Sequence, residues 1–166
     1  MFTYLKMAGA VAAVALGIVP AAQAQNLDAQ DQKFMQDAAK GGVMEVQMGR
    51  LGLEKSQSEG VKSLSRRLMD DHSKGNRELE ALAKRKGVSL PPDDAKMVYS
   101  MPLASKSGAE FDREFAQTAV EDHEKDIAAF EKEAHSGSDP DVKKWAQQTL
   151  PTLRAHLAAA QALLKP

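Results

Sequence analysis

Four long stretches of this sequence repeat apolar residues at steps of three and four positions, the spacing that places them on one face of an α-helix. Asp139-Pro140 before the fourth stretch is typical of a helix start, and Gly87 after the second is typical of a helix stop. Aromatic residues make up only 5% of the chain, which argues against a β-sandwich or a β-barrel. The sequence therefore predicts an all-α protein with helices over about residues 28–55, 61–86, 109–135 and 139–164.

The segment between the second and third stretches, residues 88–108, is too long for a simple turn. It has no helical period and contains prolines at positions 91, 92 and 102. About 20 extended residues can span roughly 65 Å, whereas a helix of about 27 residues is about 40 Å long. The segment can therefore cross the whole bundle, which predicts a ferritin-like arrangement of two hairpins joined by one long connection. An up-down-up-down bundle is the alternative topology.

The first 24 residues have the pattern of a secretory signal peptide. Lys6 precedes an apolar run over residues 7–19, which is shorter than the roughly 20 residues that a membrane-spanning helix needs. Ala22-Gln23-Ala24 supplies the small residues that signal peptidase requires. We expect residues 1–24 to be removed, and residues 25–166 to form a single domain that is exported across the inner membrane. No later apolar run reaches spanning length, so we expect no transmembrane segment in the mature chain.

Small residues and methionines in the first stretch suggest packing roles. Glycines at 41, 42, 49 and 52 cost a helix about 1 kcal/mol each relative to alanine, and they predict that another helix backbone approaches closely there. Met44 and Met48 form a thioether pair one turn apart, as do Met97 and Met101. Such pairs suit monovalent copper, but adaptable core filling is the commoner use of methionine.

Each predicted helix carries one ionisable residue on its apolar face: Glu45, His72, His123 and His156. Counted from the first turn, Glu45 and His72 fall at the same level of the bundle, whereas His123 and His156 are offset by about 7 Å of helix rise. One carboxylate and three imidazoles at mid-bundle could bind iron, copper, manganese or zinc. Buried histidines that are hydrogen-bonded within a core have the same sequence pattern.

The spacing around these histidines differs from that of dinuclear ferritin-like enzymes, which need Glu-x-x-His on two helices. Here the residues three positions before His72, His123 and His156 are not metal ligands. Each of the first two histidines instead follows an aspartate, Asp71 or Asp122. Adjacent helical residues point about 100° apart, so such an aspartate could orient a histidine of a neighbouring helix or form a surface ion pair.

Composition and missing motifs exclude several function classes. The chain has no cysteine, which excludes disulfides, thiolate metal sites and a cysteine nucleophile. Its 22 basic and 23 acidic residues nearly cancel, and few aromatics are available for base stacking, so we expect no nucleic-acid partner. We found no phosphate-binding loop, nucleophile elbow or zinc-protease motif. The sequence thus favours a non-enzymatic protein for which no cofactor is expected.

An ordered set of motifs runs through the predicted mature chain: Phe34-x3-Ala38, Glu45, Asp71-His72, Phe111-Asp112, Asp122-His123, Phe130, Leu150-Pro151 and His156. This order resembles the secreted bacterial family called domain of unknown function 4142, over about residues 28–164. The resemblance implies a ferritin-like four-helix bundle in the periplasm or at the outer membrane. It brings no ferritin ligand set with it.

Three functional hypotheses follow. The first is an envelope binding or stress-related protein whose partner is an envelope protein or ligand. The second is a metal-binding bundle in which Glu45, His72, His123 and His156 are ligands, oriented by Asp71 and Asp122. The third is a pH-responsive interaction module that uses the same histidines between about pH 5 and 8.

Overall fold

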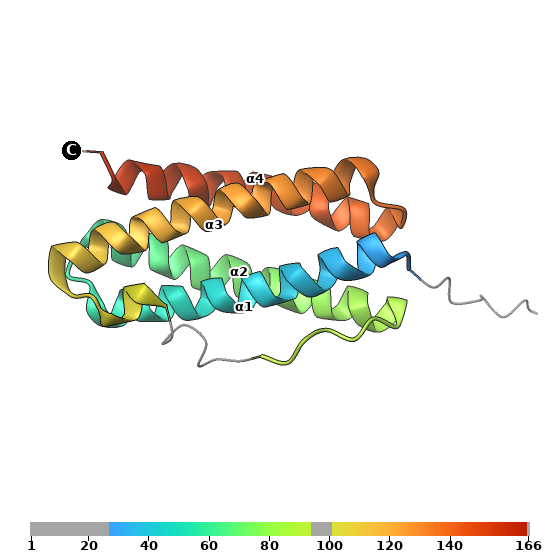
Figure 1. The fold of residues 1–166 in the computed structure, drawn as a ribbon, viewed down its shortest axis with the longest axis horizontal. Helices are drawn as coiled ribbons and strands as arrows, with labels where there is room; N and C mark the ends of the chain where they lie inside the picture. Colours follow the sequence, from blue (N-terminus) through green and yellow to red (C-terminus); the bar gives the residue numbers. More distant parts are fainter. Residues whose placement is uncertain (1–26, 94–100, 166) are drawn as a thin grey trace, which may run out of the picture.

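The computed structural model describes residues 27–93 and 101–165, which form a bundle of long α-helices (Figure 1). The helices of this described part are α1 (Ala29–Lys55), α2 (Glu59–Lys86), α3 (Gly108–Ser136) and α4 (Pro140–Leu163), with a short 3-10 helix η2 (Pro102–Ser105) before α3. The described residues contain no β-strand. The predicted all-α class with four helices is therefore confirmed.

Helix ends are set by side chains that cap free backbone amides. Asp139 caps α4 by accepting hydrogen bonds from the amides of Asp141 at 2.9 Å and Val142 at 3.1 Å. Ser58 accepts from the amide of Val61, so α2 begins at Glu59, two residues before the start that the apolar pattern predicts. At the other end of α2, Gly87 adopts a left-handed conformation with φ of 70°, as expected for a glycine that stops a helix.

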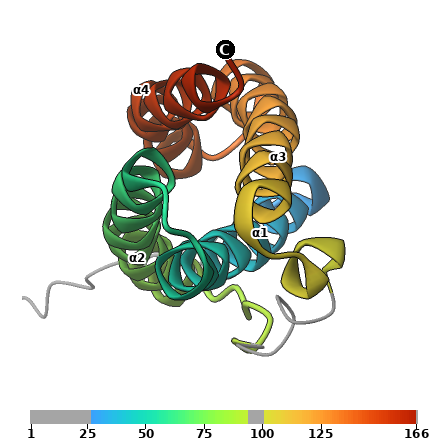
Figure 2. The same cartoon turned by 90° about the vertical axis from the view of Figure 1, so that its left-hand side faces the viewer.

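The order of the helices in space follows from contacts at the two ends of the bundle. At one end, Lys86 at the end of α2 pairs with Asp139 before α4 at 2.7 Å. At the opposite end, Ser56 after α1 donates to Asp112 near the start of α3 at 2.5 Å. α2 therefore ends at one end of the bundle and α3 starts at the other, as Figures 1 and 2 show. This confirms the ferritin-like arrangement with a long connection between the two hairpins and rules out the up-down-up-down alternative.

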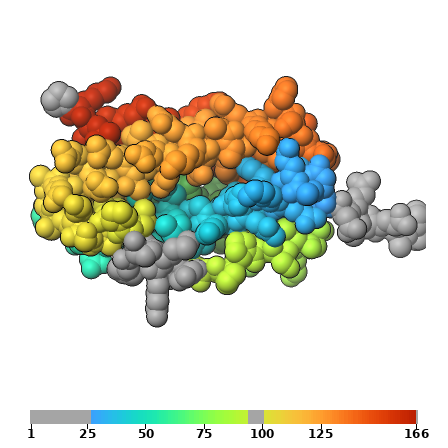
Figure 3. All heavy atoms as spheres, in the orientation of Figure 1, coloured from blue at the N-terminus to red at the C-terminus, as the bar shows by residue number. Residues whose placement is uncertain are grey.

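Within each hairpin the helices pack antiparallel, and the glycines of α1 allow a close approach to α2. A Cβ atom added at Gly49 would lie only 2.7 Å from the backbone oxygen of Ser65. A Cβ at Gly42 would overlap the side-chain amide of Asn76. The contact at Gly49 confirms the predicted approach of another helix backbone. At Gly42 and Gly52 the close neighbours are side chains, and Gly41 makes only ordinary contact with Asp126, so the prediction is wrong at those three positions. Between the hairpins, α1 and α3 lie side by side on the face shown in Figure 3.

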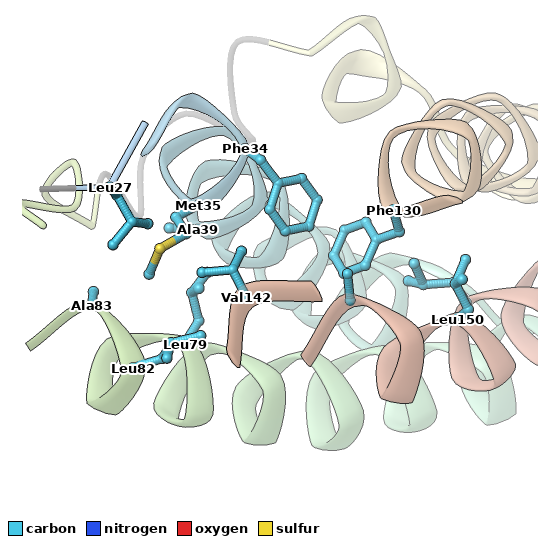
Figure 4. Packing of buried hydrophobic residues seen from close by; sticks show 12 residues of the cluster. Leu27, Phe34, Met35, Ala39, Leu79, Leu82, Ala83, Phe130, Val142 and Leu150 are labelled. Atoms are coloured by element: carbon cyan, nitrogen blue, oxygen red, sulfur yellow. The ribbon is translucent and has the colours of Figure 1, made fainter. Parts of the chain in front are cut away.

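Buried apolar side chains form two clusters, one in each half of the bundle. The first cluster is drawn in Figure 4 and includes Phe34 and Phe130, whose rings meet edge to face with centroids 4.9 Å apart. The second cluster includes Phe111 and Phe115. Met48 belongs to it and is 1% exposed, as expected for core filling. The two clusters leave a layer between them at mid-bundle.

The predicted signal peptide, residues 1–24, and Met97 lie outside the described residues. Among the residues that are described, no helix combines the length and the apolar character needed to cross a membrane.

Two buried acidic residues, Asp31 and Glu133, lie at the end of the bundle where α1 starts. From their proximity we expect the stability of the protein to depend on pH. Glu133 is buried beside Asp31, and burial together with the neighbouring carboxyl group raises the pKa of Glu133 to about 7. The folded state thus binds a proton more tightly than the unfolded state, so stability falls as pH rises from about 4.5 to 7.

We expect Glu133→Gln to remove this loss. Allowing for screening by solvent, the variant should be more stable than the parent by about 1 kcal/mol, or about 2–4 °C, at pH 8. The difference should disappear near pH 4, where Glu133 is neutral in both states. Thermal melts of both proteins between pH 4 and 8 check this, and a difference that does not vary with pH would contradict it.

Candidate metal centre

The mid-bundle layer contains the ionisable residues that the sequence placed on the apolar faces. On each helix this residue falls between the two apolar clusters: Glu45 on α1, His72 on α2, His123 on α3 and His156 on α4. His123 and His156 are fully buried, and Glu45 is 3% exposed. Elsewhere in the layer, the ring of His72 is half-buried and its Nε2 atom is inaccessible to solvent.

The predicted offset between His123 and His156 along the bundle does not keep their rings apart. Nε2 of His123 lies 3.2 Å from Nδ1 of His156. Helical side chains lean toward the N-terminus of their own helix. Since α3 and α4 are antiparallel, His123 leans away from the turn between them and His156 leans toward it. The two rings therefore approach each other and close the gap that helix rise alone predicts.

His72 completes a three-histidine cluster, which we define as His72, His123 and His156. One nitrogen from each ring lies within 4.8 Å of the corresponding nitrogens of the other two. The ring centroids are 5.2 to 5.6 Å apart. The cluster brings together one residue from each of three helices, so it exists only when the bundle is folded.

Hydrogen bonds on the outer sides of two rings fix which nitrogen carries the proton. Nδ1 of His123 lies 2.8 Å from the carbonyl oxygen of Ala119, which can only accept, so this nitrogen is protonated. Nε2 of His156 lies 2.9 Å from Oδ2 of Asp71, so this nitrogen donates as well. In the neutral rings, the two nitrogens that face each other at 3.2 Å therefore both present lone pairs. Such a pair is stabilised only by a cation between the nitrogens.

Burial disfavours a proton as that cation. Burial lowers the pKa of His72 to about 3 and that of His123 to about 4, and it also lowers the pKa of His156. Near neutral pH the rings are therefore uncharged, with free lone pairs. These pKa values lie below the pH 5–8 range that the pH-responsive module requires, so His72 and His123 do not fit that hypothesis.

The separations suit a single metal ion. Two nitrogens that each lie 2.0–2.1 Å from one ion, at angles of 90–110°, are about 2.9–3.4 Å apart. The separation of 3.2 Å between His123 and His156 falls in this range. Separations of up to 4.8 Å exceed this range by about 1.4 Å, so binding all three nitrogens to one ion requires a movement of about that size. The unpartnered Nε2 of His72 is the atom free to make it.

Glu45 lies close to the cluster but on the wrong side of it to be a ligand. Its Oε1 is 3.8 Å from Nδ1 of His123, the protonated nitrogen that points away from His156. Its Oε2 is buried without a partner. Burial and, to a smaller extent, Asp122 and Asp126 raise the pKa of Glu45 well above its ordinary value. The structure therefore places a buried carboxyl group with a raised pKa behind His123 rather than a fourth ligand.

The two aspartates that precede histidines have different roles. Asp71 reaches across from α2 to α4 and orients the ring of His156, as a carboxylate beside a metal-binding histidine commonly does. Asp122 instead pairs with Lys125 at the surface, at 3.5 Å, and among the described residues its carboxylate makes no hydrogen bond to a histidine. The orienting role suggested for Asp122 is not supported.

Several polar residues near the cluster were missed by the sequence analysis. Asp126 follows His123 by three positions and Asn76 follows His72 by four, so each lies one helical turn away on the same face. The motifs used for the sequence prediction had a carboxylate before the histidine, and these two residues follow one. Both residues line a cavity of about 40 Å³ beside the cluster, and burial raises the pKa of Asp126 to about 6.

Solved structures with the same fold include one protein that is described in two metal-bound forms. A DUF305 fragment from Deinococcus radiodurans superposes with a TM-score of 0.72 at 18% identity, covering 84% of this chain and 98% of that one. CopM in a silver-bound form gives 0.66 at 18% identity, covering 80% and 92%. CopM in a Cu(II)-bound form gives 0.64 at 16% identity, covering 80% and 93%. At these identities the similarity establishes the fold alone.

Sequence comparison identifies the family. No curated protein matches this chain significantly. The sequence model of the family described as Domain of unknown function (DUF4142) matches residues 18–163, which include all four long helices of the described structure and every histidine of the cluster. The chain therefore belongs to the DUF4142 family.

Proposed function

We propose that this protein binds a divalent transition-metal ion, Cu²⁺ or Zn²⁺, through His72, His123 and His156. The observation that carries the proposal is the pair of imidazole lone pairs that face each other at 3.2 Å with their opposite ring nitrogens anchored by Ala119 and Asp71. The buried nitrogens of histidines that serve only as core residues usually have a hydrogen-bond partner, and Nε2 of His72 has none.

The donor set indicates the class of ion. Imidazole nitrogens suit copper, zinc, nickel and iron, and Cu²⁺ forms the tightest complexes among the divalent ions. The chain has no cysteine that could favour a softer ion through a thiolate. CopM, which has the same fold, is described in silver-bound and Cu(II)-bound forms, and this similarity supports a preference for copper.

We further propose that the protein works in the bacterial cell envelope as a binding protein rather than an enzyme. The signal-peptide pattern over residues 1–24 supports export. An exported protein that holds a single copper or zinc ion could sequester that ion or pass it to a partner. This proposal joins the envelope-binding hypothesis to the metal-binding one and gives the bound ligand a chemical identity.

Metal titration of the untagged, chelator-free protein tests the proposal. We expect one Cu²⁺ or Zn²⁺ per chain, and His72→Gln should weaken binding by more than about 100-fold because it removes one of three ligands. His135→Ala is the matched control, since His135 is exposed and outside the cluster. Cu²⁺ should also quench the fluorescence of Trp145, the single tryptophan, which lines the cavity next to the cluster.

Two results would count against the proposal. Equal affinity in the parent and in His72→Gln would place the metal elsewhere, and so would a loss of binding in His135→Ala. Circular dichroism of each variant separates loss of a ligand from loss of the fold.

A further inference from the structure

The cavity of about 40 Å³ beside the three-histidine cluster, which we call the central chamber, is lined by residues from all four long helices. The charged groups in its wall near neutral pH are the carboxylates of Asp71 and Asp126, and no lysine or arginine of the described residues lines it. A narrow space with walls of low dielectric constant concentrates the field of such groups. The chamber therefore favours a cation over an anion.

The size of the chamber limits what can pass through it. Its volume corresponds to roughly three water-sized positions, at 10–15 Å³ each. That is enough for a metal ion that keeps about two of its waters, but too little for a metal ion inside an organic chelator. Asn76 and Thr152 bring oxygen-bearing side chains to the wall, which suit a partly dehydrated cation.

The chamber borders a part of the interface between α2 and α4 where the packing leaves space. Gly75 of α2 lines the chamber, and nothing lies within 4 Å of the position that a Cβ would take there. Glycine weakens a helix relative to alanine, and close approach of a neighbour does not explain it at this position. On α4, Thr149 and Thr152 line the chamber and are half-buried. Asp71 also lines the chamber while its side chain is 44% exposed, so this carboxylate is in contact with both solvent and chamber.

At the inner end of the chamber, the nitrogen atoms that would bind the ion are covered. Nε2 of His72 has no accessible surface, so it does not face the chamber although His72 lines it. The rings of His123 and His156 are each held by a hydrogen bond on their outer side, whereas Nε2 of His72 has no hydrogen-bond partner among the described residues. Rotation of the His72 ring is therefore the movement that can turn a ligand nitrogen toward an ion in the chamber.

We infer that the central chamber is the path by which the metal ion enters and leaves the three-histidine cluster. The ion enters beside Asp71 and Gly75 at the interface of α2 and α4, and a rotation of His72 then brings Nε2 onto it. This inference rests on the proposed metal-binding function and deepens it, because it explains how a buried centre exchanges its ion. An entry path affects the rates of binding and release, whereas the ligands set the affinity.

Gly75→Leu tests the path without altering a histidine. Leucine favours the helix, and its side chain has room to extend into the chamber. We expect Cu²⁺ to bind and to dissociate about tenfold more slowly, with Kd changed by less than about twofold, because a blocked path raises the barrier and leaves both end states as they were. Gly75→Ala, which adds a single methyl group, is the matched control and should keep the rates of the parent protein.

The rates can be measured with the protein's own fluorophore. Stopped-flow quenching of Trp145, the single tryptophan, follows the binding of Cu²⁺, and transfer of Cu²⁺ from the loaded protein to excess EDTA follows its release. Metal content and circular dichroism of each variant show that it is folded and binds one ion.

A second variant tests the charge of the path. Asp71 also orients His156, so Asp126 is the carboxylate to change. At pH 7.5, above the pKa of about 6 of this group, Asp126→Asn should lower the association rate of Cu²⁺ about threefold at low salt and less at high salt. Glu124→Gln removes the same charge from an exposed position of α3 and should leave the rate unchanged.

The outcomes separate this inference from the proposed function. If Gly75→Leu binds and releases Cu²⁺ at the rates of the parent, or loses affinity through faster release alone, the ion reaches the cluster by another route and the metal-binding proposal stands. Equal association rates in Asp126→Asn and Glu124→Gln would overturn the inference in the same way. If the parent does not bind Cu²⁺, or if His72→Gln binds it as tightly as the parent, the proposed function fails and the entry path with it. Equal slowing of binding and release in Gly75→Leu, absent in Gly75→Ala, establishes the path.

Discussion

Cu²⁺ or Zn²⁺ is expected to raise the free energy of unfolding of this protein by about 2.7 kcal/mol when the free ion is at 100 times its Kd. The reason is that the ligands come from α2, α3 and α4 and meet only in the folded bundle. For a chain of this size the gain corresponds to an increase in Tm of about 5–10 °C. Thermal unfolding followed by circular dichroism, with increasing metal, measures it.

The variants of the cluster give this prediction its control. In His156→Leu the rise in Tm with metal should disappear, although the apolar replacement itself can leave the metal-free protein equally stable or more stable. In His135→Ala the rise should match that of the parent. A metal-dependent rise that persists in His156→Leu would show that the stabilising ion binds outside the cluster.

The arrangement of the helices could be predicted from the sequence because it depends on features that a sequence displays directly. The apolar steps of three and four gave the four helices, and the length of the segment over residues 88–108 gave the crossover. The short 3-10 helix η2 in the connection was missed, and so was the cap at Ser58, which starts α2 two residues early. A local hydrogen bond of this kind outweighs the apolar pattern at a helix end.

The candidate centre could be predicted from the sequence only in part. Position along a helix follows from counting residues, and this placed Glu45 and His72 at one level but offset His123 from His156 by about 7 Å. The direction of each side chain depends on helix rotation and on the lean of the side chain, which the packing of the bundle decides. Glu45 therefore lies behind His123, and Asp122 points toward Lys125.

The buried polar layer is costly, and this cost is itself an argument for function. The bundle has two well-packed apolar clusters. Leucine in the positions of His123 and His156 would connect these clusters, and it has no polar atoms that lose their hydration on burial. Burial instead keeps these rings uncharged near neutral pH, which is the state in which a nitrogen can bind a metal. The buried imidazoles therefore lower the stability of the metal-free protein, and their unpaired nitrogens are suited to binding a cation.

The largest expected loss of stability is at Asp31, which is fully buried in the first turn of α1. Its two carboxylate oxygens accept from the backbone amides of Ser138 at 3.0 Å and Asp139 at 2.7 Å, joining α1 to the turn before α4. Asp31→Ala leaves both amides without a partner. We expect a loss of about 2–3 kcal/mol, or about 4–12 °C in Tm.

Two variants distinguish this role from a general effect of removing an acid from α1. Asp37→Ala removes an exposed carboxylate paired with Lys33 on the same helix and should change stability by no more than about 0.5 kcal/mol. Asp31→Asn keeps one acceptor oxygen and should lose about half as much as Asp31→Ala. The melts are best made at pH 6, where Glu133, with its pKa raised to about 7, is mostly neutral and repels Asp31 least. Equal Tm values for Asp31→Ala and Asp37→Ala would mean that the turn before α4 is held without the Asp31 bridge, because the two variants differ chiefly in the backbone amides that they leave unpaired.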